Sequence, residues 1–315
     1  MRRWTAILVL VFVVCFSGNV FSGTLTLKEA REFLSNTHKM YCQETGEYYP
    51  GLDISVLWEK AGIKPVPIYQ GAEEYLFGYG LKGENGKAIY YPETVLTGEG
   101  DIKVLRVSAS VVPDYQFLFF IKEKEDWIFF EHIDLFSQKY EEPEIKFLGD
   151  DLFYIDQLEF YGSGVSWTSR VFYAVNDGQV ISCLKIPVHG WVSGWGMMAS
   201  REFSSSFSFT DKRLTVEHKM DVLGDTSVFD PDRESESYML PLFSVTRKLD
   251  FTWTGRAFEW GGMGDEISGR ELEMPFDLNE KEFFKEYKSE FEALKQGNGR
   301  QKEWYAIFMK KLEGI

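Results

Sequence analysis

The chain has 315 residues, with 49 acidic against 34 basic side chains, so its formal net charge is −15. At 44% hydrophobic it has a globular composition, and its length allows one or two domains with a sizeable core. The acidic balance argues against nucleic acid, since phosphate binding needs a basic surface, and it disfavours adsorption to anionic lipid. Aromatic residues make up 17% of the chain. Because they favour strands, we expect a β-rich body.

Residues 1–22 have the pattern of an export signal. Arg2 and Arg3 precede an apolar stretch from Trp4 to Phe16, and a positive start followed by such a stretch is typical of a signal peptide. The stretch is shorter than the about 20 residues that a membrane span needs. We therefore expect cleavage after Ser22, with an uncleaved anchor as the alternative.

No second long apolar run follows, so the mature chain is expected to have no transmembrane span and to lie outside the cytoplasm, periplasmic or secreted. It would be two units more negative than the full chain, because the signal holds two arginines and no acids. Cys15 follows Val14 rather than a small residue, which argues against lipid attachment. Cys42 and Cys183 remain. They could form a disulfide in an oxidising compartment or act as two buried apolar thiols.

Residues 23–68 are expected to form an N-terminal helical segment. Thr26 and Glu29 fit the capping box. Helical spacing then continues through five positions on one face: Leu27, Ala30, Leu34, His38 and Tyr41. A second short helix is predicted from Asp53 to Gly62, after which prolines prevent continuation.

Residues 69–265 are expected to form an antiparallel β domain. Aromatic and β-branched runs alternate with turn residues here, which indicates roughly a dozen strands joined by hairpins. The expected strands are 75–79, 88–91, 101–110, 115–122, 126–133, 144–149, 153–161, 170–176, 179–188, 205–210, 214–222, 238–247, 251–254 and 257–260. So many strands exceed what a flat sheet carries easily, so the sheet should curl, split into a sandwich or form a partial propeller.

Residues 266–315 return to helix. Asn279 can cap a helix with Phe283, Tyr287, Phe291 and Leu294 on one face, and the run 297–299 ends it. A last helix is expected from Arg300. The fold class predicted is therefore mainly β within an α+β chain, with N-terminal helices and two C-terminal helices packed on a large antiparallel sheet.

Two short motifs match those of enzymes, but the secondary structure expected around them does not suit the chemistry. Residues 78–83 match GxGxxG, but a turn and a strand follow where dinucleotide binding needs a helix. Residues 182–185 match SxxK on a strand, where serine and lysine three apart face opposite sides. The four histidines are scattered, without the spacing of zinc ligands. We expect no cofactor, and the sequence identifies no catalytic residue.

Two segments are candidate sites for a ligand or a metal ion. Trp191 and Trp195 lie among small residues in 190–196, which is expected to be a loop that presents an aromatic platform or else two core side chains. Asp225, Asp230 and Asp232 belong to an acidic loop that could supply oxygen ligands to calcium, although a solvated loop is the alternative.

A stretch from about 127 to 203 resembles uncharacterised exported proteins and lipoproteins of bacteria. The shared positions are Trp127, His132-Ile133-Asp134, Tyr140, Pro143, Gly162-Ser163-Gly164, Phe172-Tyr173, the turn 176–178, Pro187 and Gly190. The resemblance implies export and a β-rich body, and it implies no activity. Gly162, Ser163 and Gly164 are read as a tight turn between strands or as a loop that offers backbone amides to a ligand.

The function expected is that of a non-catalytic exported binding or envelope-associated protein, whose partner is an envelope protein or a glycan. One alternative is an extracytoplasmic hydrolase of polysaccharide or peptide, with carboxylates that the fold brings together. The other is a structural module stabilised by calcium.

Overall fold

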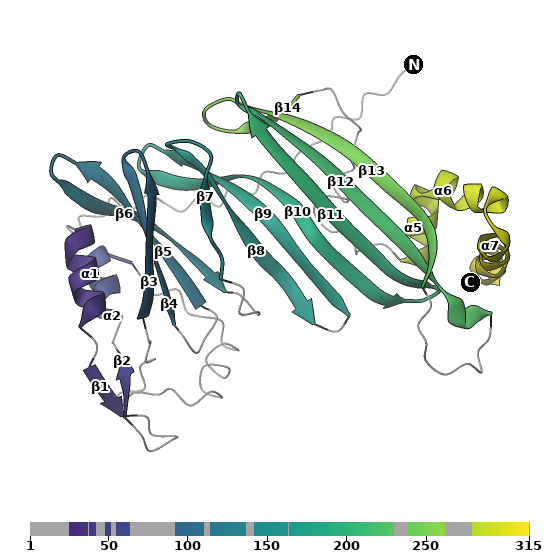
Figure 1. Ribbon diagram of the computed structural model, residues 1–315, viewed down its shortest axis with the longest axis horizontal. Helices are drawn as coiled ribbons and strands as arrows, with labels where there is room; N and C mark the ends of the chain where they lie inside the picture. Colours follow the sequence, from purple (N-terminus) through teal and green to yellow (C-terminus); the bar gives the residue numbers. More distant parts are fainter. Residues whose placement is uncertain are drawn as a thin grey trace.

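The computed structural model describes residues 25–36, 38–41, 48–51, 55–63, 92–109, 114–136, 142–162, 164–229, 239–261 and 279–314. Over these residues the protein is mainly β, with two large antiparallel sheets and a few helices (Figure 1). The expected signal segment and the strands expected at 75–79 and 88–91 lie outside the described residues.

The smaller sheet is a meander in the order β3-β4-β5-β6. Its strands are β3 (Pro92–Glu99), β4 (Ile102–Ala109), β5 (Asp114–Glu123) and β6 (Asp126–Phe136). β3 was not among the strands expected from the sequence. This strand forms through its pairing with β4, in which Leu96 lies opposite Leu105.

The larger sheet has eight strands, each paired with its neighbour in sequence. They are β7 (Ile145–Phe147), β8 (Leu152–Gly162), β9 (Val165–Asn176), β10 (Gln179–Trp195), β11 (Met198–Thr210), β12 (Arg213–Asp225), β13 (Met239–Trp253) and β14 (Phe258–Trp260). The strand expected separately at 251–254 is the end of β13 instead. Figure 1 shows this sheet strongly curved along its length. Both the antiparallel arrangement and the curl were predicted.

An aromatic cluster joins the two sheets. Phe119 of β5 lies 5.3 Å from Phe153 of β8, ring centre to ring centre, and Phe153 stacks on Tyr173 of β9 at 5.3 Å. Phe117, Phe119 and Phe153 are fully buried. Burial of such large rings is among the strongest contributions a core can receive. Among the described strands, the architecture is thus two packed sheets rather than radial blades.

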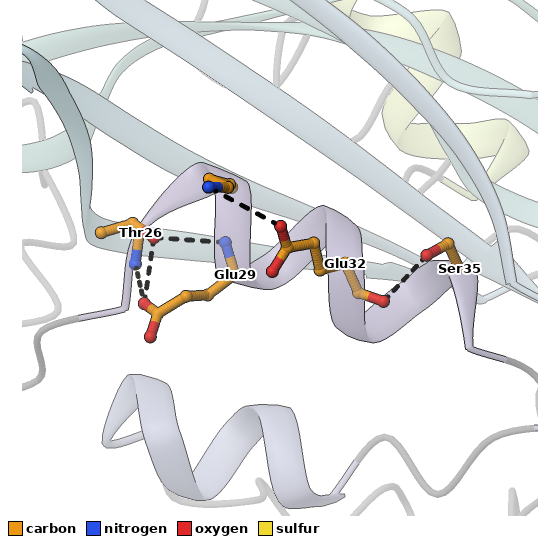
Figure 2. Close-up of polar contacts among 5 residues, drawn as sticks. Thr26, Glu29, Glu32 and Ser35 are labelled. Carbon is orange, nitrogen blue, oxygen red and sulfur yellow. Dashed lines mark hydrogen bonds and ion pairs between the residues drawn. The ribbon is translucent and has the colours of Figure 1, made fainter.

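Two N-terminal helices, α1 (Leu27–Ser35) and α2 (Ser55–Ala61), cover the other face of the smaller sheet. The predicted capping box is present: Glu29 N donates to Thr26 Oγ1 at 3.2 Å, and Thr26 N donates to Glu29 Oε2 at 2.9 Å (Figure 2). The helix was wrongly predicted to reach Tyr41. It ends at Asn36, whose backbone leaves the helical region and whose side chain donates to Glu32 O.

The segment predicted to be helical throughout also contains a strand pair. β1 (His38–Tyr41) pairs with β2 (Tyr48–Gly51) in an antiparallel register. Helical spacing at positions 38 and 41 was misleading, because apolar spacing alone cannot detect a break such as Asn36.

The C-terminal helices α5 (Glu280–Glu286), α6 (Lys288–Ala293) and α7 (Gly299–Gly314) pack on the far end of the larger sheet (Figure 1). Phe291, Trp304 and Phe308 form a fully buried stack there. Asn279 caps α5, as predicted, by accepting from Lys281 N and Glu282 N. The first expected helix is split at Tyr287, where the backbone leaves the helical region. None of the described helices is long and apolar enough to cross a membrane.

Candidate functional site

A cleft of about 440 Å³ opens between the two sheets. One wall comes from β6, the other from β8, β9 and β10, and the segment before β7 closes one side. Its lining residues are Asp134, Leu135, Glu142, Pro143, Glu144, Lys146, Asp156, Gln157, Leu158, Glu159, Thr168 and His189. Its size lies within the range usual for ligand pockets.

The cleft forms because the segment that precedes β7 does not pair with β8. Arg106 of β4 holds that segment toward the smaller sheet: its Nη1 donates to Pro143 O at 3.2 Å, and its Nη2 contacts Glu142 Oε2 at 2.5 Å. Pro143 has no N–H to offer to a β ladder. Arg106 is buried, so both its guanidinium group and its aliphatic chain are held in this position.

Five carboxylates line the cleft, from three separate parts of the chain: Asp134, Glu142, Glu144, Asp156 and Glu159. Among the lining side chains, Lys146 is the one permanent cation, and His189 is exposed. None of the five acids is buried. Ionised carboxylates only accept hydrogen bonds, so the cleft mainly presents acceptors to whatever enters it.

Two of these carboxylates are paired with cations of the larger sheet. Arg170 forms a forked pair with Asp156, at 2.7 and 2.8 Å. Lys185 Nζ lies 2.6 Å from Glu159 Oε1. Paired guanidinium and carboxylate groups of this kind have a defined geometry. The carboxylates of Asp156 and Glu159 are therefore held in fixed positions before any ligand is present.

Trp191 lies on the same face as the cleft lining. His189 pairs with Thr168 and Trp191 with Ser166 in an unbroken register, and residues two apart on a strand share a face. His189 and Thr168 both line the cleft, and Trp191 follows His189 by two residues on that face without being one of the lining residues. Trp191 is 41% exposed, so it does not occupy a core position, and its use as a platform for a ligand stays a prediction.

The segment 190–196 was wrongly predicted to be a loop, because its glycines were read as turn signals. It is the end of β10, up to Trp195. Glycine at 190 is required by close packing, because a Cβ there would lie 2.6 Å from both Ser166 O and Trp167 Cβ. The side chain of Trp195 lies outside the described part.

Gly162 and Gly164 stand at the turn between β8 and β9, with φ of 145° and 80°, which favour glycine. The tight turn is as predicted. Ser193 N donates to Gly164 O at 2.7 Å, so the turn is fastened to β10 two residues from Trp191. Ser163 lies outside the described residues, and presentation of backbone amides to a ligand stays a prediction.

Of the three expected calcium ligands, the structure describes only Asp225, so the calcium site stays a prediction. Asp225 accepts from Ser227 N at 2.8 Å and from Ser227 Oγ at 2.6 Å, which caps the 3₁₀ turn Thr226–Val228. Asp230 and Asp232 lie outside the described residues. Among the residues the structure does describe, no three His, Cys, Asp or Glu groups could hold a metal ion.

Cys183 is half-buried, and its Sγ donates to Phe172 O at 3.3 Å. Burial raises the pKa of this thiol to about 12, so it is a poor nucleophile at neutral pH. Cys42 lies outside the described residues, and the disulfide between the two stays a prediction.

The larger sheet also holds a serine–histidine pair, in which His218 is buried and Ser205 is half-buried. Ser205 Oγ lies 2.8 Å from His218 Nδ1 and donates to Pro187 O at 2.7 Å. A nucleophile needs a base that a carboxylate orients, whereas the charged group acting on His218 is Arg247. Burial, and then Arg247, lower the pKa of His218 to about 4. The pair is therefore built for packing rather than catalysis.

Sequence reasoning missed the cleft acids, because they come from three separate parts of the chain and no spacing connects those parts. A usable signal was Glu142-Pro143-Glu144, in which proline prevents pairing between two acids. Asp134 and Pro143 were noted only as positions of the resemblance. Comparison with protein-family models, curated proteins and solved structures finds no match for this chain.

Proposed function

We propose that this protein is a non-catalytic exported binding protein whose ligand site is the cleft between its two sheets. The observation that carries the proposal is the convergence of five acidic residues in one cleft, with an exposed tryptophan two residues along β10 from the lining residue His189. Pockets that combine a few placed polar groups with an aromatic surface are the usual form of a binding site.

The lining indicates a ligand rich in hydrogen-bond donors. Carboxylates accept from hydroxyl, ammonium and guanidinium groups, and a tryptophan face stacks on a sugar ring or attracts a cation. Envelope proteins and glycans both offer such groups. Export is supported by the sequence of residues 1–22, with cleavage near Ser22.

The proposal is tested by titrating the purified protein with a panel of cell-wall glycans and basic peptides, following the heat of binding. Trp191→Ala should weaken binding of the panel's best ligand by about ten-fold, as expected for an anchor residue. Trp260→Ala is the matched control, since Trp260 is 44% exposed and lies on β14, at the opposite edge of the larger sheet from β7 and β8. Absence of any binding, or equal effects of the two substitutions, would contradict the proposal.

A hydrolase is the second candidate, favoured by the same carboxylates. Glycosidases need one carboxyl held protonated in apolar surroundings and a second one close by. Here none of the five acids is buried, and Asp156 and Glu159 are paired with cations. Release of reducing ends or of peptide fragments, abolished by Glu159→Gln, would establish the hydrolase and overturn the non-catalytic reading.

A further inference from the structure

Resting on the proposed function, we infer that the ligand is an extended peptide segment bearing lysine or arginine, which adds as a short strand to the stretch of β8 that has no partner on its outer edge among the described residues. The peptide would lie in the cleft, between β8 and the segment Glu142–Glu144. Strand addition to an open sheet edge is a common mode of peptide recognition, in which main-chain hydrogen bonds supply affinity and side-chain pockets supply specificity.

The register of β7 locates this stretch of β8. Ile145 lies opposite Ile155, so a continued strand would place Glu144 opposite Asp156 and Pro143 opposite Gln157. That continuation does not form, because Arg106 holds Glu142 and Pro143 toward the smaller sheet. From Asp156 onward, β8 pairs only with β9 within the described chain. Its outer N–H and C=O groups face the position that an added strand would occupy.

The stretch of β8 without an outer partner in the described chain is also the stretch that carries its two cleft acids. Asp156, Gln157, Leu158 and Glu159 are both the unpaired stretch of β8 and a wall of the cleft. A register shift between Leu158 and Phe160 leaves Glu159 without a partner on β9, and such bulges commonly re-aim a side chain toward a site. The ladder open to a partner thus runs from Asp156 to Leu158, with the Glu159 carboxylate at its end.

The negative charge of the cleft favours a peptide segment with basic side chains. Asp134 and Glu144 stand across the cleft from the acids of β8, so side chains on both sides of an added strand would meet carboxylates. Arg106, Arg170 and Lys185 form ion pairs with Glu142, Asp156 and Glu159 and offset part of their charge. The chain as a whole carries −15, which adds long-range attraction for a cationic segment.

The test uses a blocked octapeptide of alternating lysine and valine as the probe, titrated into the full-length protein. Binding is expected, and a peptide with glutamate in place of lysine should bind about ten-fold more weakly or worse. Two further peptides carry N-methyl groups, one on every lysine nitrogen and one on every valine nitrogen. Successive residues point their N–H groups to opposite edges of a strand, so at least one of these two should lose binding.

Protein variants test the location. Glu144→Lys should weaken binding of the lysine–valine peptide by about ten-fold, because it replaces an attraction with a repulsion at the cleft wall. Glu303→Lys makes the same charge change on an exposed position of α7 and should have little effect. Equal effects of the two variants would show that only net charge matters, and would overturn the inference.

The outcomes separate this inference from the proposed function. If no lysine–valine peptide binds but a glycan does, and Trp191→Ala weakens the glycan, the cleft remains a binding site and the peptide inference is wrong. If both N-methylated peptides bind as well as the parent, strand addition is wrong. If nothing binds in the cleft, both fail.

Discussion

At the scale of single residues, His218 makes stability depend on pH. Its ring is 5% exposed, and burial together with Arg247 lowers its pKa to about 4, against about 6.5 in an unfolded chain. The unfolded state therefore binds the proton more readily between these values. The stabilising effect of the neutral ring is fully present above pH 6.5 and is lost as the pH falls toward 4, to the extent of about 3 kcal/mol.

Urea unfolding at several pH values between 4.5 and 7.5 measures this effect. His218→Phe should flatten the fall in unfolding free energy on the acid side, whereas His189→Asn, at an exposed position, should leave the slope unchanged. A His218→Phe protein with the same acid slope as the parent would show that other groups carry the pH dependence.

Gly190 is a second residue on which the candidate site depends. An added Cβ would press on Ser166 O, Trp167 Cβ and the ring of Phe203, so Gly190→Ala should destabilise the protein by about 1–3 kcal/mol. Gly149→Ala is the control, since nothing lies within 4 Å of a Cβ there, and it should change stability by less than about 0.5 kcal/mol. Equal urea midpoints for both variants would contradict the close packing of β10.

At the scale of elements, helix α1 depends on its N-terminal cap. Thr26 and Glu29 satisfy two backbone N–H groups reciprocally (Figure 2), so Thr26→Ala should cost about 1 kcal/mol in unfolding free energy. Ser35 is the matched control because its hydroxyl donates only to Glu32 O. Ser35→Ala should be close to neutral, and a thermal melt in which it costs as much as Thr26→Ala would refute the role of the cap.

Elements with a local signal were predicted, and those that depend on distant partners were not. The α1 cap and the Asn279 cap were found because each acts within one helical turn. β3 was missed because it forms through pairing with β4. His38–Tyr41 was misread as helix because it is a strand that depends on pairing with a separate segment, Tyr48–Gly51. The Trp191 segment was misread because a glycine required by packing looks the same in sequence as one required by a turn.

At the scale of the whole molecule, the site is a consequence of two sheets that pack along part of their length. The cluster around Phe119 and Phe153 holds them together. Where that packing ends, Arg106 draws Glu142 and Pro143 away from β8. No local pattern encodes this arrangement, because Arg106 and its partners are separated by more than thirty residues. The candidate cleft therefore could not be predicted from sequence, although several of its members had been noted singly.

Amide hydrogen exchange of the full-length protein, with and without the lysine–valine peptide, tests the central claim most directly. Amides on the outer edge of β8 from Asp156 to Leu158 are unpaired in the described chain, so they should exchange fast in the free protein and slow down when the peptide is bound. Residues 142–146 should also be protected, while α1 and the outer turns of the larger sheet should not change. Protection confined to places other than the cleft, or no protection despite measurable binding, would contradict the assignment of the cleft as the binding site.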